Sequence, residues 1–157
     1  MSFWTQFSTE SWTTIRFRSK YVEGTENLPI INLNYKVPAL RMNNERVVSP
    51  KDPLVIQIIP QSLKGLDISQ VRFWYSYDDG LTWKEAKVIR GDDLVPVGNQ
   101  FVTLCRNFIV KLNAPTNGIS YISIKTLAID TEGNSVEQII MRAFLVTRIS
   151  TYVRELT

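Results

Sequence analysis

The sequence contains no histidine and a single cysteine, Cys105. Without histidine the chain cannot supply a Ser-His-Asp triad, a Cys-His pair or an imidazole metal ligand, so these kinds of site are excluded. One cysteine cannot form an internal disulfide, so the fold does not depend on oxidation. Because Cys105 follows the largely apolar run 101–104, we predict that it fills space in the core rather than reacting. We expect no bound metal and no cofactor.

The chain also lacks a long apolar run and a block of like charges. No stretch approaches the ~20 apolar residues of a membrane-spanning helix, and the start, MSFWTQFSTESW, lacks the basic and continuous apolar regions of a signal peptide. The 18 Lys and Arg residues are nearly balanced by 15 Asp and Glu, and only Arg16, Arg18 and Lys20 form a short basic run. A solvated strand face explains that run, so we expect no nucleic-acid partner and no membrane span.

What is present fits a globular β domain. A length of 157 residues matches one core with an attached arm, and 44% hydrophobic with 21% charged residues excludes wholesale disorder. Short runs rich in β-branched and aromatic residues recur between clusters of Pro, Gly, Asn and Asp, whereas helical periodicity is hardly visible. We predict an all-β, two-sheet sandwich. The expected strands are 12–18, 29–35, 54–59, 71–77, 82–89, 101–112, 119–129 and 136–146, with a further short segment at 148–154.

This pattern divides the chain into three parts. We expect residues 1–50 to form an arm and an irregular connection that add strands, residues 51–147 to form the sandwich core, and residues 148–157 to form a tail or an extra strand. The connection, at about 37–53, is rich in turn-forming proline and asparagine.

The arm is unusually aromatic for a chain end. Phe3, Trp4, Phe7 and Trp12 lie in a background rich in Ser and Thr. Such residues on a free end favour aggregation, so we expect them to dock on a surface. The sequence leaves open whether that surface belongs to this chain or to a neighbouring copy.

The run at 71–77 alternates between two faces. Val71, Phe73, Tyr75 and Tyr77 share one face, which we predict to be the core face. Trp74 lies on the opposite face, where it is a candidate for packing under a loop or for contact with a partner.

One eight-residue motif carries the most information. Ser76, Asp78, Gly80, Thr82 and Trp83 fit the pattern S-x-D-x-G-x-T-W, which resembles the Asp-box hairpin of sialidase-type propellers and of several β-sandwich domains. We predict that Asp78 accepts hydrogen bonds from turn amides, that Gly80 adopts a positive φ and that Trp83 closes over the turn. A structural hairpin is favoured over a calcium site, because two neighbouring aspartates fall short of the roughly six oxygens that calcium takes.

A second turn is predicted around Asp130, Gly133 and Asn134. In the favoured interpretation, Asp130 caps backbone amides while Gly133 or Asn134 adopts a positive φ. The alternative makes Asp130 and Glu132 calcium ligands beside the aspartates of the first hairpin.

Together these motifs have a recognisable order. They are the hairpin at 76–83, the segments 112–115 and 118–120, the turn at 128–136 and the closing segment 142–144, preceded by 17–19, 28–29 and Tyr35. This succession, which spans about 12–146, resembles the C-terminal accessory β-sandwich of secreted bacterial subtilisin-like serine proteases. The resemblance implies an immunoglobulin/fibronectin-III-like sandwich that is located outside the cell and lacks the catalytic domain. The N-terminal strand-forming arm, which is expected from the aromatic start, and the tail at 148–157 depart from the family pattern.

Three functions follow as hypotheses. The first is a non-catalytic accessory or binding module whose partner is an adjacent protease domain, with Trp74 as a candidate contact. The second is a structural subunit that assembles into a filament or lattice, in which the arm with Phe3, Trp4, Phe7 and Trp12 adds a strand to a neighbouring copy. The third and weakest is a glycosidase-like enzyme that pairs Asp78 with Asp130, and we expect no catalytic residue in the chain.

Overall fold

The computed structural model describes residues 10–17, 28–97 and 100–149, with the backbone alone for 92–97 and 100–106. These residues contain ten strands and no helix, which confirms the predicted all-β class. None of them therefore forms a helix that could cross a membrane.

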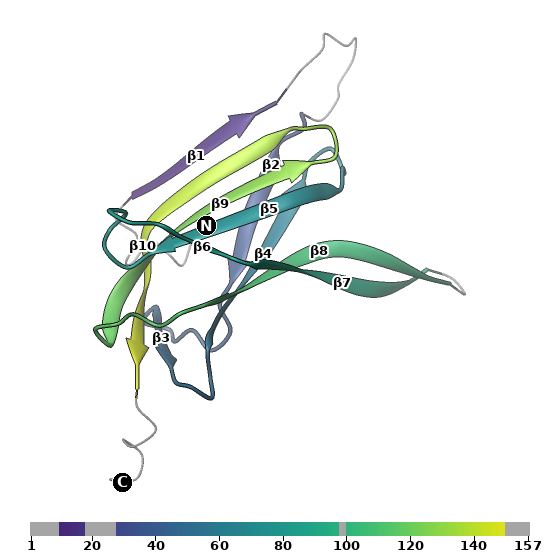
Figure 1. Ribbon diagram of the computed structural model, residues 1–157. Helices are drawn as coiled ribbons and strands as arrows, with labels where there is room; N and C mark the ends of the chain where they lie inside the picture. Colours follow the sequence, from purple (N-terminus) through teal and green to yellow (C-terminus); the bar gives the residue numbers. More distant parts are fainter. Residues whose placement is uncertain (1–9, 18–27, 98–99, 150–157) are drawn as a thin grey trace.

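The strands form two sheets (Figure 1). The larger sheet has the order β1-β10-β9-β5-β6, and β3 pairs with β10 beside this path; the smaller sheet has the order β2-β4-β8-β7. All pairs are antiparallel except β3 with β10. In the larger sheet the bounds are β1 Glu10–Arg16, β3 Glu45–Val48, β5 Ile68–Ser76, β6 Lys84–Ala86, β9 Ile119–Asp130 and β10 Ser135–Arg148. In the smaller sheet they are β2 Ile31–Lys36, β4 Leu54–Ser62, β7 Val88–Val97 and β8 Gln100–Leu112.

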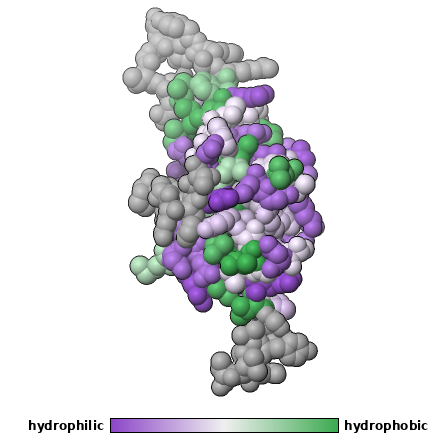
Figure 2. Space-filling view, turned by 90° about the vertical axis from the view of Figure 1, so that its left-hand side faces the viewer, coloured by the Kyte–Doolittle hydropathy of each residue, from purple (hydrophilic) through white to green (hydrophobic). Residues whose placement is uncertain are grey.

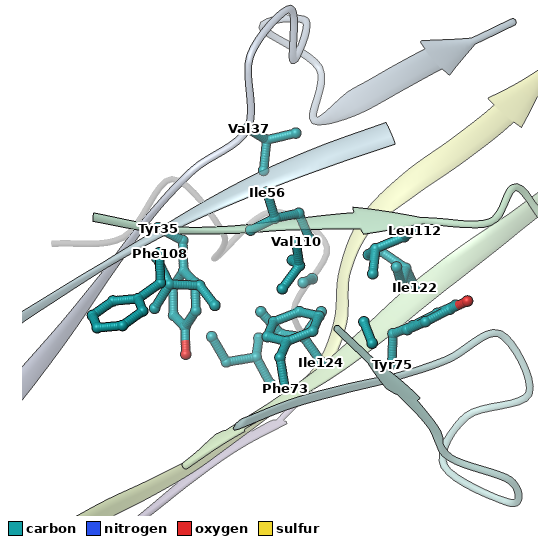
Figure 3. Packing of buried hydrophobic residues seen from close by; sticks show 14 of the residues in the cluster. Tyr35, Val37, Ile56, Phe73, Tyr75, Phe108, Val110, Leu112, Ile122 and Ile124 are labelled. Carbon is teal, nitrogen blue, oxygen red and sulfur yellow. The ribbon is translucent and has the colours of Figure 1, made fainter. Parts of the chain in front are cut away.

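One core lies between the buried faces of the two sheets, an arrangement consistent with a sandwich. Ile56 and Val110 of the smaller sheet lie opposite Phe73 and Ile124 of the larger one (Figure 3). All four side chains are completely buried, and each contributes about 1.5–3 kcal/mol to folding through lost apolar contact with water.

The alternation predicted for β5 is confirmed. Val71, Phe73 and Tyr75 are buried and Tyr77, just after the strand, is half-buried, whereas Trp74 lies on the opposite face.

The arm region contributes to this core directly. Ile31 and Tyr35 of β2 are buried, and the Tyr35 hydroxyl lies 3.0 Å from Thr126 Oγ1 and 3.1 Å from Gln138 Oε1 on the larger sheet. Burial raises the pKa of the Tyr35 hydroxyl far above its usual range, so the group stays a neutral hydrogen-bonding link between the sheets.

Two strand assignments differ from the prediction, and a third is not tested. The connection expected to be irregular contains β3, whose four residues are too few to show a period of two. The single strand expected at 82–89 is two strands, because the chain leaves the larger sheet after Ala86 and enters the smaller one at Val88. A change from one sheet to the other does not alter the pattern of apolar and polar residues along the chain, so the sequence does not reveal it. The segment predicted at 148–154 falls mostly outside the described residues, and β10 ends at Arg148.

A bulge divides β10 into two halves. Its register with β9 shifts between Ile140 and Phe144. The half before the bulge pairs with β1 and the half after it pairs with β3, so both occupy the same side of β10. The bulge also gives Arg142 a positive φ of 50°, which turns this residue toward the β5–β6 hairpin.

Candidate interaction surface

The hairpin between β5 and β6 is held by side chains of the eight-residue motif. Asp78 Oδ1 accepts hydrogen bonds from Ser76 Oγ at 2.6 Å and from the Thr82 amide at 2.9 Å, and Oδ2 accepts one from Thr82 Oγ1. The hydrogen bond from Ser76, followed by those from Thr82, lowers the pKa of Asp78 to about 2. Both carboxylate oxygens therefore have partners within the turn.

The backbone of the turn has the conformation that the motif predicts. Asp79 and Gly80 have φ values of 57° and 84°. The Trp83 ring lies against the turn, with its Cζ2 3.4 Å from the position that a Cβ on Gly80 would occupy. Met141 Cε, from the bulge of β10, is equally close.

Arg142 ties this turn to the larger sheet. Its guanidinium donates two hydrogen bonds to the Asp79 carboxylate, at 3.0 and 2.9 Å, and lies 5.2 Å from the centre of the Tyr121 ring. Its amide donates to Ser123 Oγ at 3.0 Å. The hydrogen bond from Arg142 lowers the pKa of the Asp79 carboxyl. The turn is thus fixed by both of its aspartates, which leaves neither as a free ligand.

Cations and indole rings alternate on the outer face of the larger sheet. Arg72 lies 4.8 Å from the centre of the Trp74 ring, and Lys125 lies 4.8 Å from Trp74 and 5.2 Å from Trp83. Arg72 also forms a two-point ion pair with Glu85 at 2.9 Å. Trp74, a candidate partner-binding residue, is half-buried with two cations of its own chain over its ring. It therefore offers less open aromatic surface than the sequence suggests.

The second turn is also fixed by hydrogen bonds to an aspartate, but this aspartate is buried. Asp130 Oδ1 accepts hydrogen bonds from the amides of Glu132 and Asn134 at 2.8 and 2.9 Å, and Oδ2 accepts one from Asn134 Nδ2 at 2.8 Å. Asp130 is only 1% exposed, and Gly133 has a φ of 85°. The geometry is that of an amide cap.

The structure keeps the two turns apart. Asp130 pairs with Ile68 at the start of β5, whereas Asp78 follows the end of that strand. Nine residues of extended chain separate these ends, a length of about 30 Å. The hypothesis that Asp78 and Asp130 form a glycosidase pair is therefore wrong, because such carboxyls lie within about 10 Å of each other. The alternative that both turns share one calcium ion is wrong for the same reason.

The part of the chain that the structure describes holds no cluster of three or more metal-ligating Cys, Asp or Glu residues. A groove of about 440 Å³ lies between the β5–β6 hairpin and the turn at 113–117. The backbone of Asn113 in its lining is hydrogen-bonded to two tyrosines: the Tyr77 hydroxyl donates to the Asn113 carbonyl at 2.5 Å, and the Asn113 amide donates to the Tyr75 hydroxyl at 3.4 Å.

The free edge of β1 is the most exposed apolar element among the described strands. All seven residues of β1 are exposed, and β10 is the one described strand that pairs with it. Trp12 is 50% exposed, Ile15 40% and Phe17, just after the strand, 39%. Because side chains alternate along a strand, Trp12 lies on the opposite face from Ile15 and Phe17.

This edge contains the described part of the predicted arm. Trp12 belongs to β1 and lies opposite Ile139 of β10 in the same chain. Phe3, Trp4 and Phe7 lie outside the described residues. Ile15 was not predicted as a contact residue, although an apolar residue on the face opposite Trp12 in a short strand is a signal that could have found it.

One side of the molecule has a mixed surface. Seen from the side in Figure 2, apolar patches are separated by polar residues. Neither protein-family models nor curated proteins match the chain.

Proposed function

We propose that the chain is a non-catalytic interaction module, an immunoglobulin/fibronectin-III-like sandwich that acts outside the cell as an accessory domain and binds another protein along β1. The observation that carries the proposal is the edge of β1 that faces away from β10, with which no strand in the described part of the chain pairs. An unpaired strand edge offers a row of backbone donors and acceptors to an incoming strand. β1 contains neither proline nor lysine, the residues that most often block such pairing.

The proposal that the chain is not an enzyme is supported by the structural roles of three acidic side chains. Asp78, Asp79 and Asp130 are all engaged in fixing turns. The hydrogen bonds that lower the pKa of Asp78 and of Asp79 make these two carboxylates poor acids and bases near neutral pH.

The first experiment tests docking on a protease domain, the partner that the resemblance implies. A subtilisin-like catalytic domain, produced separately, is titrated with the chain by calorimetry. We expect binding that weakens at least about tenfold when Trp12 and Ile15 are both changed to serine, because their apolar contact is lost. Leu81→Ser is the matched control, since Leu81 is 85% exposed and lies in the β5–β6 turn. Equal affinity of both variants would contradict docking along β1, and absence of binding would contradict the accessory role.

Self-assembly is the second candidate, favoured by a specific observation. β1 is apolar on both faces, so a strand added to its edge would cover Trp12 on one face and Ile15 on the other. In this candidate function the added strand comes from another copy of the chain.

A further inference from the structure

We propose that two copies of this chain join edge to edge through β1, antiparallel about a two-fold axis that passes through Thr13. This inference deepens the proposed role of β1 as the interaction edge and depends on it. It names the partner as a second copy of the chain and gives the register of the pairing.

The register follows from the charges at the two ends of β1. Glu10 begins the strand and Arg16 ends it, and the five residues between them are uncharged. If Thr13 lies opposite Thr13 of the second copy, each Glu10 lies opposite an Arg16. Such a pairing places two opposite-charge pairs at the rims of the interface, and a shift by two residues removes both.

The exposed apolar side chains are consistent with the same register. Trp12 lies opposite Thr14 of the second copy, so the two Trp12 rings are diagonal neighbours on the outer face, about 7–8 Å apart at their Cα atoms. On the other face Ile15 lies opposite Ser11. The joined sheet thus brings the two Trp12 side chains together on one face and places Ser11 beside Ile15 on the other, where the separate chain leaves Trp12 50% and Ile15 40% exposed.

The geometry of the edge allows this approach. β1 is exposed along its whole length, and its partner strand β10 lies on the opposite side. A two-fold axis makes the contact self-complementary and closed, so assembly stops at a dimer. The joined sheet would continue from β10 of one copy through both β1 strands to β10 of the other.

Charge reversal tests the register in the full-length chain. Sedimentation equilibrium is expected to give a dimer with a dissociation constant of about 10–100 µM, as for a small interface. Glu10→Arg and Arg16→Glu, made singly, each place like charges opposite each other and should weaken the dimer at least about fivefold. The double variant restores opposite pairs and should restore the dimer. Lys36→Glu, an exposed reversal on β2, is the control and should change nothing.

Crosslinking provides a second measurement with a matched control. In a Cys105→Ser background, Thr13→Cys places the two introduced thiols opposite each other, about 5 Å apart at their Cα atoms, and should give a disulfide-linked dimer. Ser11→Cys places them four residues apart along the strand, about 13 Å, and should not.

The outcomes separate this inference from the proposed function. A monomer at about 1 mM, failure of the double variant to restore association, or equal crosslinking at both positions would overturn the dimer. In those cases binding of β1 to a protease domain would still support the proposed function. A dimer that follows the predicted pattern without any protease binding would support the inference while contradicting the accessory role.

Discussion

The two aspartate-capped turns use the same chemistry in opposite surroundings. In each, one carboxylate accepts hydrogen bonds from an amide four residues later, and a glycine has a φ near 85°. Asp130 is 1% exposed, whereas the turn that follows Asp78 lies on the surface. A cap on the surface can be replaced by water, but a buried cap cannot, so the same motif has different consequences for stability.

Asp130→Ala should show the largest effect. It leaves the amides of Glu132 and Asn134 without their acceptor, and buried donors without partners are costly. We expect a loss of about 3 kcal/mol in the free energy of unfolding, measured by urea denaturation. Asp130→Asn keeps one acceptor oxygen and should lose less. A loss below that of Asp78→Ala would contradict the comparison.

Gly133→Ala should show an intermediate effect and isolate the cost of the backbone conformation. A Cβ at Gly133 would meet no heavy atom within 4 Å, so strain at a φ of 85° is the remaining cost, about 1 kcal/mol. Gly80→Ala has nearly the same φ and ordinary contacts at 3.4 Å. Thermal denaturation should therefore give nearly equal losses for the two variants. A much larger loss at Gly80 would show that Trp83 and Met141 cannot adjust.

Replacing Asp78 should have the smallest effect on the free energy of unfolding, and this effect should be visible mainly at acidic pH. Its pKa is lowered to about 2 by the hydrogen bonds from Ser76 and Thr82. The folded form therefore binds fewer protons than the unfolded form, and the stabilisation is complete above about pH 4 and lost as the pH falls through 2. Asp78→Ala should flatten this part of the stability curve between pH 4 and 2. An unchanged curve would mean that the turn does not depend on the charge.

The sequence predicts what is local and fails for what depends on distant strands. The hydrogen bonds of Asp78 and Asp130 span four residues, so their chemistry is visible in the motif itself. The alternation of Val71, Phe73 and Tyr75 similarly reveals one buried face.

Long-range features were not predictable in this way. The ion pair of Arg142 with Asp79 joins residues 63 positions apart and requires the bulge in β10. The change of sheet at Lys87 involves a single residue between β6 and β7, and no periodicity marks it. In the candidate interaction edge, Trp12 was predicted from the sequence as a contact residue. The pairing of β1 with β10 was not predicted, because the position of a strand at the edge of a sheet depends on which distant strands pair with it.

The pairing of β1 with β10 also has a consequence for synthesis. Thr13 contacts Gln138, 125 positions later in the chain. Because β1 precedes β10 by so many positions, a ribosome makes β1 first, and β1 stays without this partner while most of the domain is translated. During that interval, neighbouring polypeptides on the same messenger RNA carry identical unpaired strands. Slow closure of this long loop thus favours early encounters between nascent chains, before either has completed its own sheet.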